Sequence, residues 1–116
     1  MKWIGKWRNQ YGSILAITDD KDGALAGTFR TALEDSSFFG MELAISGIHQ
    51  GACISFSFAG RTASGDAMSS FTGLYRDGKI ETLWYVIVDG IKDHPEQKRS
   101  WPHAALTNAD TFTPVI

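Results

Sequence analysis

The sequence has little of several features that define particular protein classes. It contains one cysteine, Cys53, so no disulfide can form within the chain. Its net charge is -2 at pH 7, and the absence of a basic excess argues against a nucleic-acid binder or a membrane-surface binder. The longest apolar runs, such as "LWYVIV" (83–88), are far shorter than the ~20 residues of a membrane span. The start, "MKWIGKWRNQ" (1–10), has no continuous apolar segment, so we expect no signal peptide there.

What is present is the composition of an ordinary globular protein. The chain has 116 residues, of which 43% are hydrophobic and 21% are charged, and this length predicts a single domain over residues 1–116. The compartment depends on the native start of the chain. We expect a cytoplasmic protein if Met1 is that start, and a secreted one if a signal peptide has been removed.

The chain reads as a series of short strands. Glycine is frequent, proline is scarce, and short runs rich in β-branched and aromatic residues alternate in character. Turns are expected at "TDDKDG" (18–23) and "YRDGK" (75–79), where Asp-Gly suits a hairpin, and "KDHPEQKRS" (92–100) is expected to be an exposed loop. About eight strands in sequence can close into an all-β, antiparallel up-and-down β-barrel, which leaves no free edge and can hold one small ligand. The strands are expected at 2–9, 13–18, 24–33, 40–47, 52–60, 68–75, 80–88 and 110–115.

Alternation along these strands predicts inward faces of mixed character. Phe56 and Phe58 share a face, with Ser55 and Ser57 on the other. By the same rule, large aromatic residues share faces with Asn, Ser, Thr and Asp. The pairs and sets are Trp7 with Asn9, Phe29 with Thr31 and Leu33, Ser69 with Phe71, Thr82 with Trp84 and Val86, and Asp110 with Phe112. Apolar walls that carry a few polar groups are typical of a small-ligand pocket.

Other readings of the polar residues stay open at this point. Asn9 and Ser13 flank a turn around Gly12, where such side chains often satisfy backbone groups. A calcium loop through "TDDKDG" would need a glutamate at the position of Phe29. The remaining metal-binding and catalytic signals are missing: the histidines and Cys53 lack metal-ligand spacing, and no nucleophile elbow, phosphate loop or paired carboxylates appear. We therefore do not expect an enzyme, and we expect neither a bound metal ion nor a cofactor.

Six segments, in order along nearly the whole chain, resemble the avidin/streptavidin family of biotin-binding proteins. Each segment alone is a weak match, but together their order and spacing imply the eight-stranded avidin barrel. The segments are "GKWRNQYGS" (5–13), "DGALAGTFRTAL" (22–33), "ISFSFAG" (54–60), "SSFTGLY" (69–75), "IETLWYV" (80–86) and "WPHAALTNADTFT" (101–113).

The resemblance implies noncovalent binding of biotin and assigns a role to individual residues. Asn9 and Ser13 would donate hydrogen bonds to the ureido oxygen, while Asp110 and Thr31 would each accept one from a ureido N–H. Donors and acceptors fixed by a barrel bind a polar ring without reorganising, which favours affinity. Further residues would surround the rest of the ligand: Ser69 near the ring sulfur, Phe71, Trp84 and Val86 in the apolar wall, and Leu33 and Asp35 in the loop over the carboxylate tail.

Three positions depart from the family pattern. The family's tyrosine, a third donor to the ureido oxygen, is Phe29 here, which removes a bond of about 1.5–3 kcal/mol. The tryptophan expected at the end of the fifth strand is Gly60, which removes a contact of ~2–4 kcal/mol. A serine that often holds the tail carboxylate is Ala67. We therefore expect affinity for biotin below that of typical avidins. Phe38 or Phe39 is a candidate to fill the space beside Gly60.

Assembly is also expected from the resemblance and from strand 80–88. In tetrameric members a tryptophan from a neighbouring subunit closes the site, and Trp101 matches that position. Tyr85 and Ile87 would point outward beside inward Trp84 and Val86, as in a strand buried between subunits. A homo-oligomer is therefore expected, with a tetramer favoured over a dimer. Two alternatives to biotin binding remain: the same barrel with another small apolar ligand, or an oligomeric barrel with no ligand.

Overall fold

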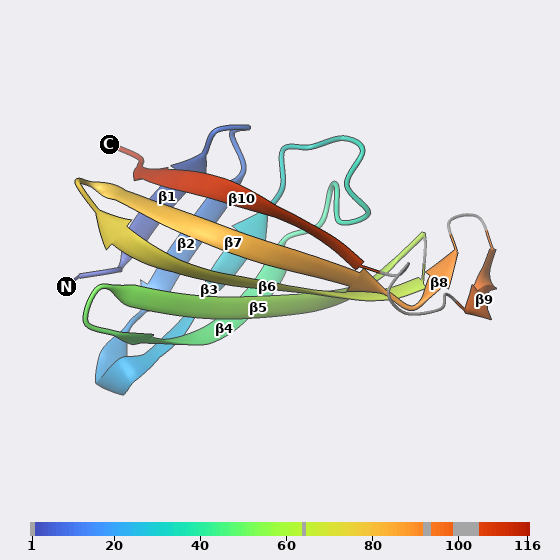
Figure 1. Ribbon diagram of the computed structural model, residues 1–116, viewed down its shortest axis with the longest axis horizontal. Coiled ribbons are helices and arrows are strands. Elements are labelled where there is room, and N and C mark those ends of the chain that lie inside the picture. The colour runs from blue at the N-terminus through green and yellow to red at the C-terminus, as the bar shows by residue number, and fades with distance from the viewer. Residues whose placement is uncertain (1, 64, 92–93, 99–104) are drawn as a thin grey trace.

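The chain folds into a closed β-barrel, as the strand pattern predicts. The computed structural model describes residues 2–63, 65–91, 94–98 and 105–116, and the side chains of 2–63, 65–90 and 106–116. Eight antiparallel strands close the barrel in the order β1-β10-β7-β6-β5-β4-β3-β2 (Figure 1). These strands are β1 (Gly5–Asn9), β2 (Ile14–Asp19), β3 (Ala24–Arg30), β4 (Leu43–Gln50), β5 (Cys53–Thr62), β6 (Gly65–Arg76), β7 (Lys79–Val88) and β10 (Ala105–Pro114).

Three parts of the strand prediction need correction. The third strand ends at Arg30 rather than residue 33, because Thr31 Oγ1 accepts a hydrogen bond from Leu33 N and turns the chain out of the sheet. The last strand already starts at Ala105. Part of the expected loop 92–100 forms a two-stranded ladder between β8 (Gly90–Ile91) and β9 (His94–Lys98), which is made by backbone pairing that side-chain alternation does not reveal.

The two ends of the barrel differ in their connections. One end, called the turn end, holds the short connections near 20–23, 51–52 and 77–78. There Asp77 and Gly78 both have positive φ angles, of 53° and 80°, as the predicted Asp-Gly hairpin requires, and the expected turn at 18–23 contains a short 3-10 helix, η1 (Lys21–Gly23). The opposite end, called the loop end, holds the connections 10–13 and 31–42 and the long connection from β7 to β10.

Inward side chains form a continuous aromatic and aliphatic core. Phe56 and Phe58 are buried, as alternation predicts, and the deepest residues include Phe112, Leu15 and Ile80. The strands approach one another closely at some glycines. A Cβ atom added at Gly47 would overlap the carbonyl oxygen of Ser55 on the neighbouring strand, so only glycine fits there.

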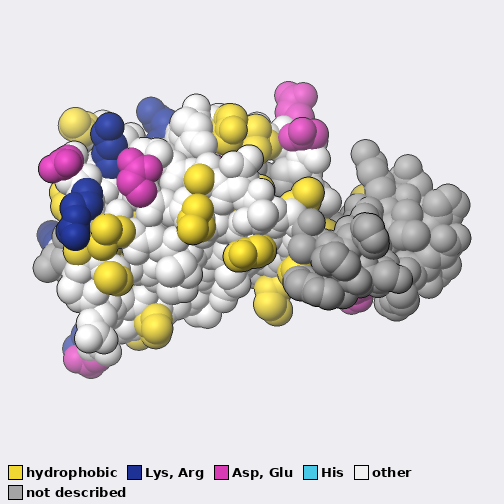
Figure 2. Space-filling model, viewed as in Figure 1, with side chains coloured by type: hydrophobic (Ala, Val, Ile, Leu, Met, Phe, Trp, Pro, Cys, Tyr) yellow, Lys and Arg dark blue, Asp and Glu magenta, His cyan; other side chains and the backbone are white. Residues whose placement is uncertain are grey.

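The outer face of β6 and β7 is uncharged along its middle. Its outward residues include Met68, Ser70 and Thr72 on β6, and Leu83 and Tyr85 on β7. Figure 2 shows hydrophobic side chains spread over this side of the barrel, with most charged side chains gathered toward the edges of the view. Among the described residues, no helix has the length and apolar character needed to cross a membrane.

Candidate functional site

A small cavity of about 70 Å³ lies inside the barrel, toward the loop end. Its wall is formed by inward side chains from β1, β3, β5, β6, β7 and β10, and by the 10–13 and 31–42 connections. The lining residues are Asn9, Ser13, Phe29, Thr31, Leu33, Ser36, Phe38, Phe58, Ser69, Phe71, Trp84, Val86 and Asp110.

The cavity brings together all but two of the residues that the sequence points to. Asp35 is exposed and does not line the cavity, because the turn closed by Ser36 N and the carbonyl oxygen of Leu33 places Ser36 there instead. Trp101 lies outside the described residues. The ligand contacts of this set stay predictions, but its members do converge on one space.

Asn9 is held in a single orientation at the cavity. Its Oδ1 accepts hydrogen bonds from the backbone N–H groups of Tyr11 (3.0 Å) and Ser13 (2.9 Å). This fixes its Nδ2 toward the Asp110 carboxylate, where it donates to Oδ2 at 3.0 Å. The turn chemistry expected of Asn9 and its position in the cavity wall are thus two results of the same contacts.

Ser13 keeps a proton that is not committed to the backbone. Its Oγ accepts a hydrogen bond from Ala32 N at 2.9 Å and lies 3.5 Å from Thr31 Oγ1, a contact in which either hydroxyl can be the donor. Thr31 Oγ1 likewise accepts from Leu33 N at 3.2 Å. A hydroxyl that accepts from the backbone still has its own O–H to donate, so Ser13 can serve as a donor to a group in the cavity.

Asp110 is the acidic residue of the cavity and is buried there. Its carboxylate accepts from Asn9 Nδ2 and, at 3.1 Å, from Gln10 Nε2, while its carbonyl oxygen accepts from Thr82 Oγ1 at 2.9 Å. A carboxylate has about four lone-pair sites, so two protein donors leave acceptor capacity. The cavity therefore offers both a donor and an acceptor to a polar ring.

The opposite walls are aromatic. Phe29 stacks on Phe58 with ring centroids 5.0 Å apart, and Phe71 stacks on Phe56 at 4.9 Å. Trp84 lies beside Phe71 at 6.2 Å, and its indole N–H is buried with no hydrogen-bond partner among the described residues. Such faces bury an apolar ring or chain next to the polar cluster.

The resemblance implies that Gly60 stands where the family has a tryptophan, and the structure shows what surrounds this position. Gly60 does not line the cavity; the aromatic contribution of β5 is Phe58, two residues earlier and on the same face. The space beside Gly60 is filled from the 31–42 connection. A Cβ atom added there would lie 3.6 Å from Phe38 and 3.2 Å from Leu43. Phe38 is buried and contacts Phe58 edge-on at 5.2 Å, whereas Phe39 is exposed, so the filling residue is Phe38.

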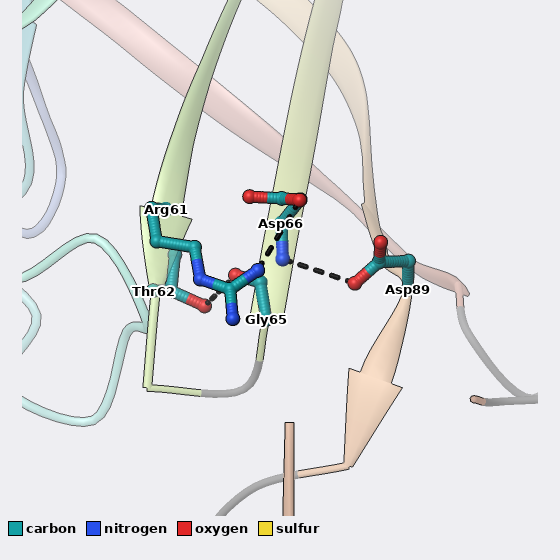
Figure 3. A network of polar contacts seen from close by, with 5 residues as sticks. All are labelled: Arg61, Thr62, Gly65, Asp66 and Asp89. Atoms are coloured by element: carbon teal, nitrogen blue, oxygen red, sulfur yellow. Dashed lines mark hydrogen bonds and ion pairs between the residues drawn. The ribbon is translucent and has the colours of Figure 1, made fainter. Parts of the chain in front are cut away.

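A larger groove of about 710 Å³ lies on the outside of β5, β6 and β7 near the loop end. Met68, Tyr85 and Ile87 line it, and so does Ala67, while an exposed ion pair between Arg61 and Asp66 lies at its side. Figure 3 shows the neighbouring polar network, in which Asp66 N donates to Asp89 Oδ1 at 3.0 Å and Thr62 Oγ1 donates to the carbonyl oxygen of Gly65 at 2.9 Å. These contacts join the β5–β6 hairpin to the segment after β7. The groove is larger than the inner cavity but lacks its buried donors and acceptors, so we place the candidate binding site inside the barrel.

Among the described residues, no group of three His, Cys, Asp or Glu side chains is arranged to hold a metal ion.

Ser36 and Phe58 line the cavity but were not among the site residues expected from the sequence. Phe58 could have been found from alternation, since it shares a face with Phe56, whereas the placement of Ser36 depends on loop geometry.

Comparisons with known proteins agree with this barrel. The bradavidin2–biotin complex is 21% identical, covers 100% of both chains and has a TM-score of 0.79. Apo shwanavidin is 26% identical over 100% of this chain and 98% of its own, with a TM-score of 0.81. The rhizavidin–biotin complex is 21% identical over 99% and 93%, with a TM-score of 0.78. No curated protein matches the chain. The sequence model of the Avidin family matches residues 1–115, and the chain therefore belongs to the avidin family.

Proposed function

We propose that this protein binds biotin noncovalently in the inner cavity and acts as a binding protein rather than an enzyme. The observation that carries the proposal is the buried cluster of Asn9, Ser13, Thr31 and Asp110 beside stacked aromatic rings. Biotin has a ureido group with one oxygen and two N–H groups, next to an apolar ring and chain. The cluster supplies both the donors and the acceptors that such a group needs.

The contacts within the cluster suggest how the polar ring is held. Ser13 donates its hydroxyl proton to no backbone group and can give it to the ureido oxygen, and Asn9 has a second amide proton beyond the one it gives to Asp110. Asp110 retains lone pairs for one ureido N–H, and Thr31 Oγ1 is the acceptor nearest to Ser13 for the other. All four groups are fixed before binding, which lowers the entropy lost on binding.

Two of the similar structures, those of bradavidin2 and rhizavidin, are biotin complexes. They support the ligand class for a barrel of this shape. The family membership supports it further, because the cavity lies inside the same kind of barrel.

We further propose that affinity lies below that of typical avidins, chiefly because of Phe29. Its ring occupies the cavity wall without a hydroxyl, which removes a donor worth about 1–1.5 kcal/mol to the neutral ureido oxygen. The contribution of Gly60 is smaller than the sequence alone suggests, since Phe38 and Leu43 fill the adjacent space.

Calorimetric titration with biotin tests the proposal, with Asp110→Ala as the first variant. Strong binding that this substitution weakens by about 1.5–3 kcal/mol would support a functioning pocket, because a hydrogen bond to a charged group is lost. Arg61→Ala is a matched control, since Arg61 is charged and pairs with Asp66 outside the cavity. No heat and no rise in melting temperature at millimolar biotin would contradict the proposal. The barrel would then have another small ligand or none.

A second role, assembly into a homo-oligomer, is favoured by the outer face of β6 and β7, which is uncharged along its middle. Met68, Leu83 and Tyr85 are 56%, 67% and 56% exposed on this face. Exposed apolar side chains grouped on one face are typical of a protein interface. We propose that copies of this chain associate there, with a tetramer as the expected assembly.

Light scattering on the purified protein tests the assembly. We expect a mass well above the 12.7 kDa of one chain, and Leu83→Asp is expected to lower it. Ile48→Asp is a matched control, because Ile48 is 68% exposed on β4, which is not adjacent to β7 in the barrel. A monomer at all concentrations, or equal effects of both variants, would contradict an interface at this face.

A further inference from the structure

Gln10 is an exposed turn residue whose side-chain amide makes three hydrogen bonds to β10. Its Nε2 lies 3.1 Å from Asp110 Oδ1 and 3.3 Å from the carbonyl oxygen of Ala109, and its Oε1 accepts from Thr111 N at 3.0 Å. One side-chain amide therefore contacts the residues before and after Asp110 as well as the carboxylate of Asp110 itself.

These contacts continue the β1–β10 ladder beyond the end of β1. The paired residues of the two strands run from Trp7 and Pro114 to Asn9 and Phe112, where β1 ends. Beyond that point the Gln10 side chain pairs with β10 in place of the backbone. The segment that carries Asp110 is thus held on one side by β7 and on the other by Gln10.

The two oxygens of the Asp110 carboxylate have different protein donors. Asn9 Nδ2 donates to Oδ2, and Gln10 Nε2 donates to Oδ1. Both amides are themselves oriented by backbone N–H groups that donate to their oxygens: Tyr11 and Ser13 for Asn9, and Thr111 for Gln10. With both oxygens anchored, the carboxylate plane is fixed, and so is the direction of the lone pair that remains for a ligand.

We propose that Gln10 is a positioning residue for Asp110, and that through this carboxylate it makes the site select ligands that donate an N–H at that point of the ring. The inference rests on the proposed binding of biotin. Gln10 does not line the cavity, so it acts on the ligand only through Asp110.

Titrations with three ligands separate this role from general support of the fold. The ligands are biotin, a cyclic carbamate analogue with oxygen in place of the N–H that faces Asp110, and the isomer with oxygen in place of the other N–H. We expect Gln10→Ala to weaken biotin binding about tenfold, the scale of one hydrogen bond. It should lower the preference for biotin over the first analogue by a similar factor and leave the preference over the second unchanged.

Two comparisons complete the test. Gln50→Ala is the matched control, because Gln50 is an exposed glutamine at the turn end, and it should change no affinity beyond twofold. In the Asp110→Ala background, Gln10→Ala should have no further effect on biotin binding. Equal losses for all three ligands would overturn the proposal in favour of a structural role. Unchanged affinity in Gln10→Ala would overturn it as well.

A ligand-free measurement separates this inference from the proposed function. In the NMR spectrum of the free protein, Asp110→Ala should move the side-chain amide proton signals of Gln10, while those of Gln50 stay in place. If the unmodified protein binds no biotin, the proposed function fails, and these signals still decide whether Gln10 holds the carboxylate. Unmoved Gln10 signals would overturn the positioning role.

Discussion

The barrel has two aromatic clusters, and only one of them has the character of a binding site. At the turn end, Trp3 and Trp7 lie 6.5 Å apart and both meet Tyr75 edge-on. Two of their N–H groups are hydrogen-bonded within the protein: Trp7 Nε1 donates to the carbonyl oxygen of Trp3, and Trp3 N donates to Asp20 Oδ2. Toward the loop end, the phenylalanines surround hydroxyl, amide and carboxylate groups that keep hydrogen-bonding capacity.

Aromatic content therefore does not distinguish a core from a binding site in this fold. The distinction is the presence of fixed polar groups with unused donors or acceptors that face a cavity. In the turn-end cluster the buried indole N–H of Trp3 has no hydrogen-bond partner among the described residues, but neither Trp3 nor Trp7 lines the cavity. If this comparison is correct, substitutions in the turn-end cluster should lower the free energy of unfolding, and those in the loop-end cluster should mainly lower the affinity for biotin.

The largest effect is expected for Trp7→Ala, on stability alone. Trp7 is buried and its indole N–H is hydrogen-bonded, so its removal should lower the free energy of unfolding by ~3–5 kcal/mol. Biotin affinity of the folded protein should change by less than about twofold, since Trp7 does not line the cavity. Chemical denaturation and titration measure the two quantities. A large loss of affinity with little loss of stability would break the comparison.

The next effect is expected for Phe38→Ala, mainly on affinity. Phe38 contributes a buried ring to the cavity wall from the 31–42 connection, so we expect a loss of about 2 kcal/mol in biotin binding, mostly through faster dissociation. Phe39→Ala is the control, because this neighbouring ring is 49% exposed. Equal affinities for the two variants would show that the connection does not close the site.

A gain of affinity is expected for Phe29→Tyr. The new hydroxyl would join the donors of the cavity and strengthen binding by about 1–1.5 kcal/mol, the upper range for a neutral hydrogen bond. Competition against biotin-saturated wild-type protein measures the gain. Weaker binding instead would mean that the stacked position against Phe58 leaves no room for a hydroxyl, and that Phe29 does not limit the affinity.

Alternation predicts the inward faces of the strands, and the resemblance to the avidin family assigns most of the candidate site residues. Phe56, Phe58 and Phe71 point inward as expected, and the outward position of Tyr85 follows from the same period. Alternation does not give the height of a residue along the barrel, which depends on the tilt and stagger of the strands. Phe58 and Gly60 lie on the same face of β5, and only Phe58 lies at the height of the cavity.

Loop geometry and side-chain reach account for the remaining differences. Ser36 rather than Asp35 turns inward because of hydrogen bonds within the 31–42 connection, which no periodic pattern encodes. Gln10 is exposed in the turn after β1, and no periodic pattern marks it as part of the site. The available signal was its place directly after Asn9, but its contact with Asp110 joins residues that lie 100 positions apart in the chain.

The smallest effects, and the sharpest form of the comparison, come from two serines. Ser13 and Ser69 are each 1% exposed and both line the cavity. Ser69 donates its proton to the carbonyl oxygen of Tyr85 at 3.0 Å, whereas Ser13 accepts from Ala32 N and donates to no backbone group. Titration should therefore show that Ser13→Ala weakens biotin binding by about 0.5–1 kcal/mol, the net value of one hydrogen bond, and that Ser69→Ala weakens it by less. The two substitutions remove the same atom from equally buried sites, so burial cannot explain a difference between them. A larger effect at Ser69 would show that unused hydrogen-bonding capacity is not what separates the binding cluster from the core.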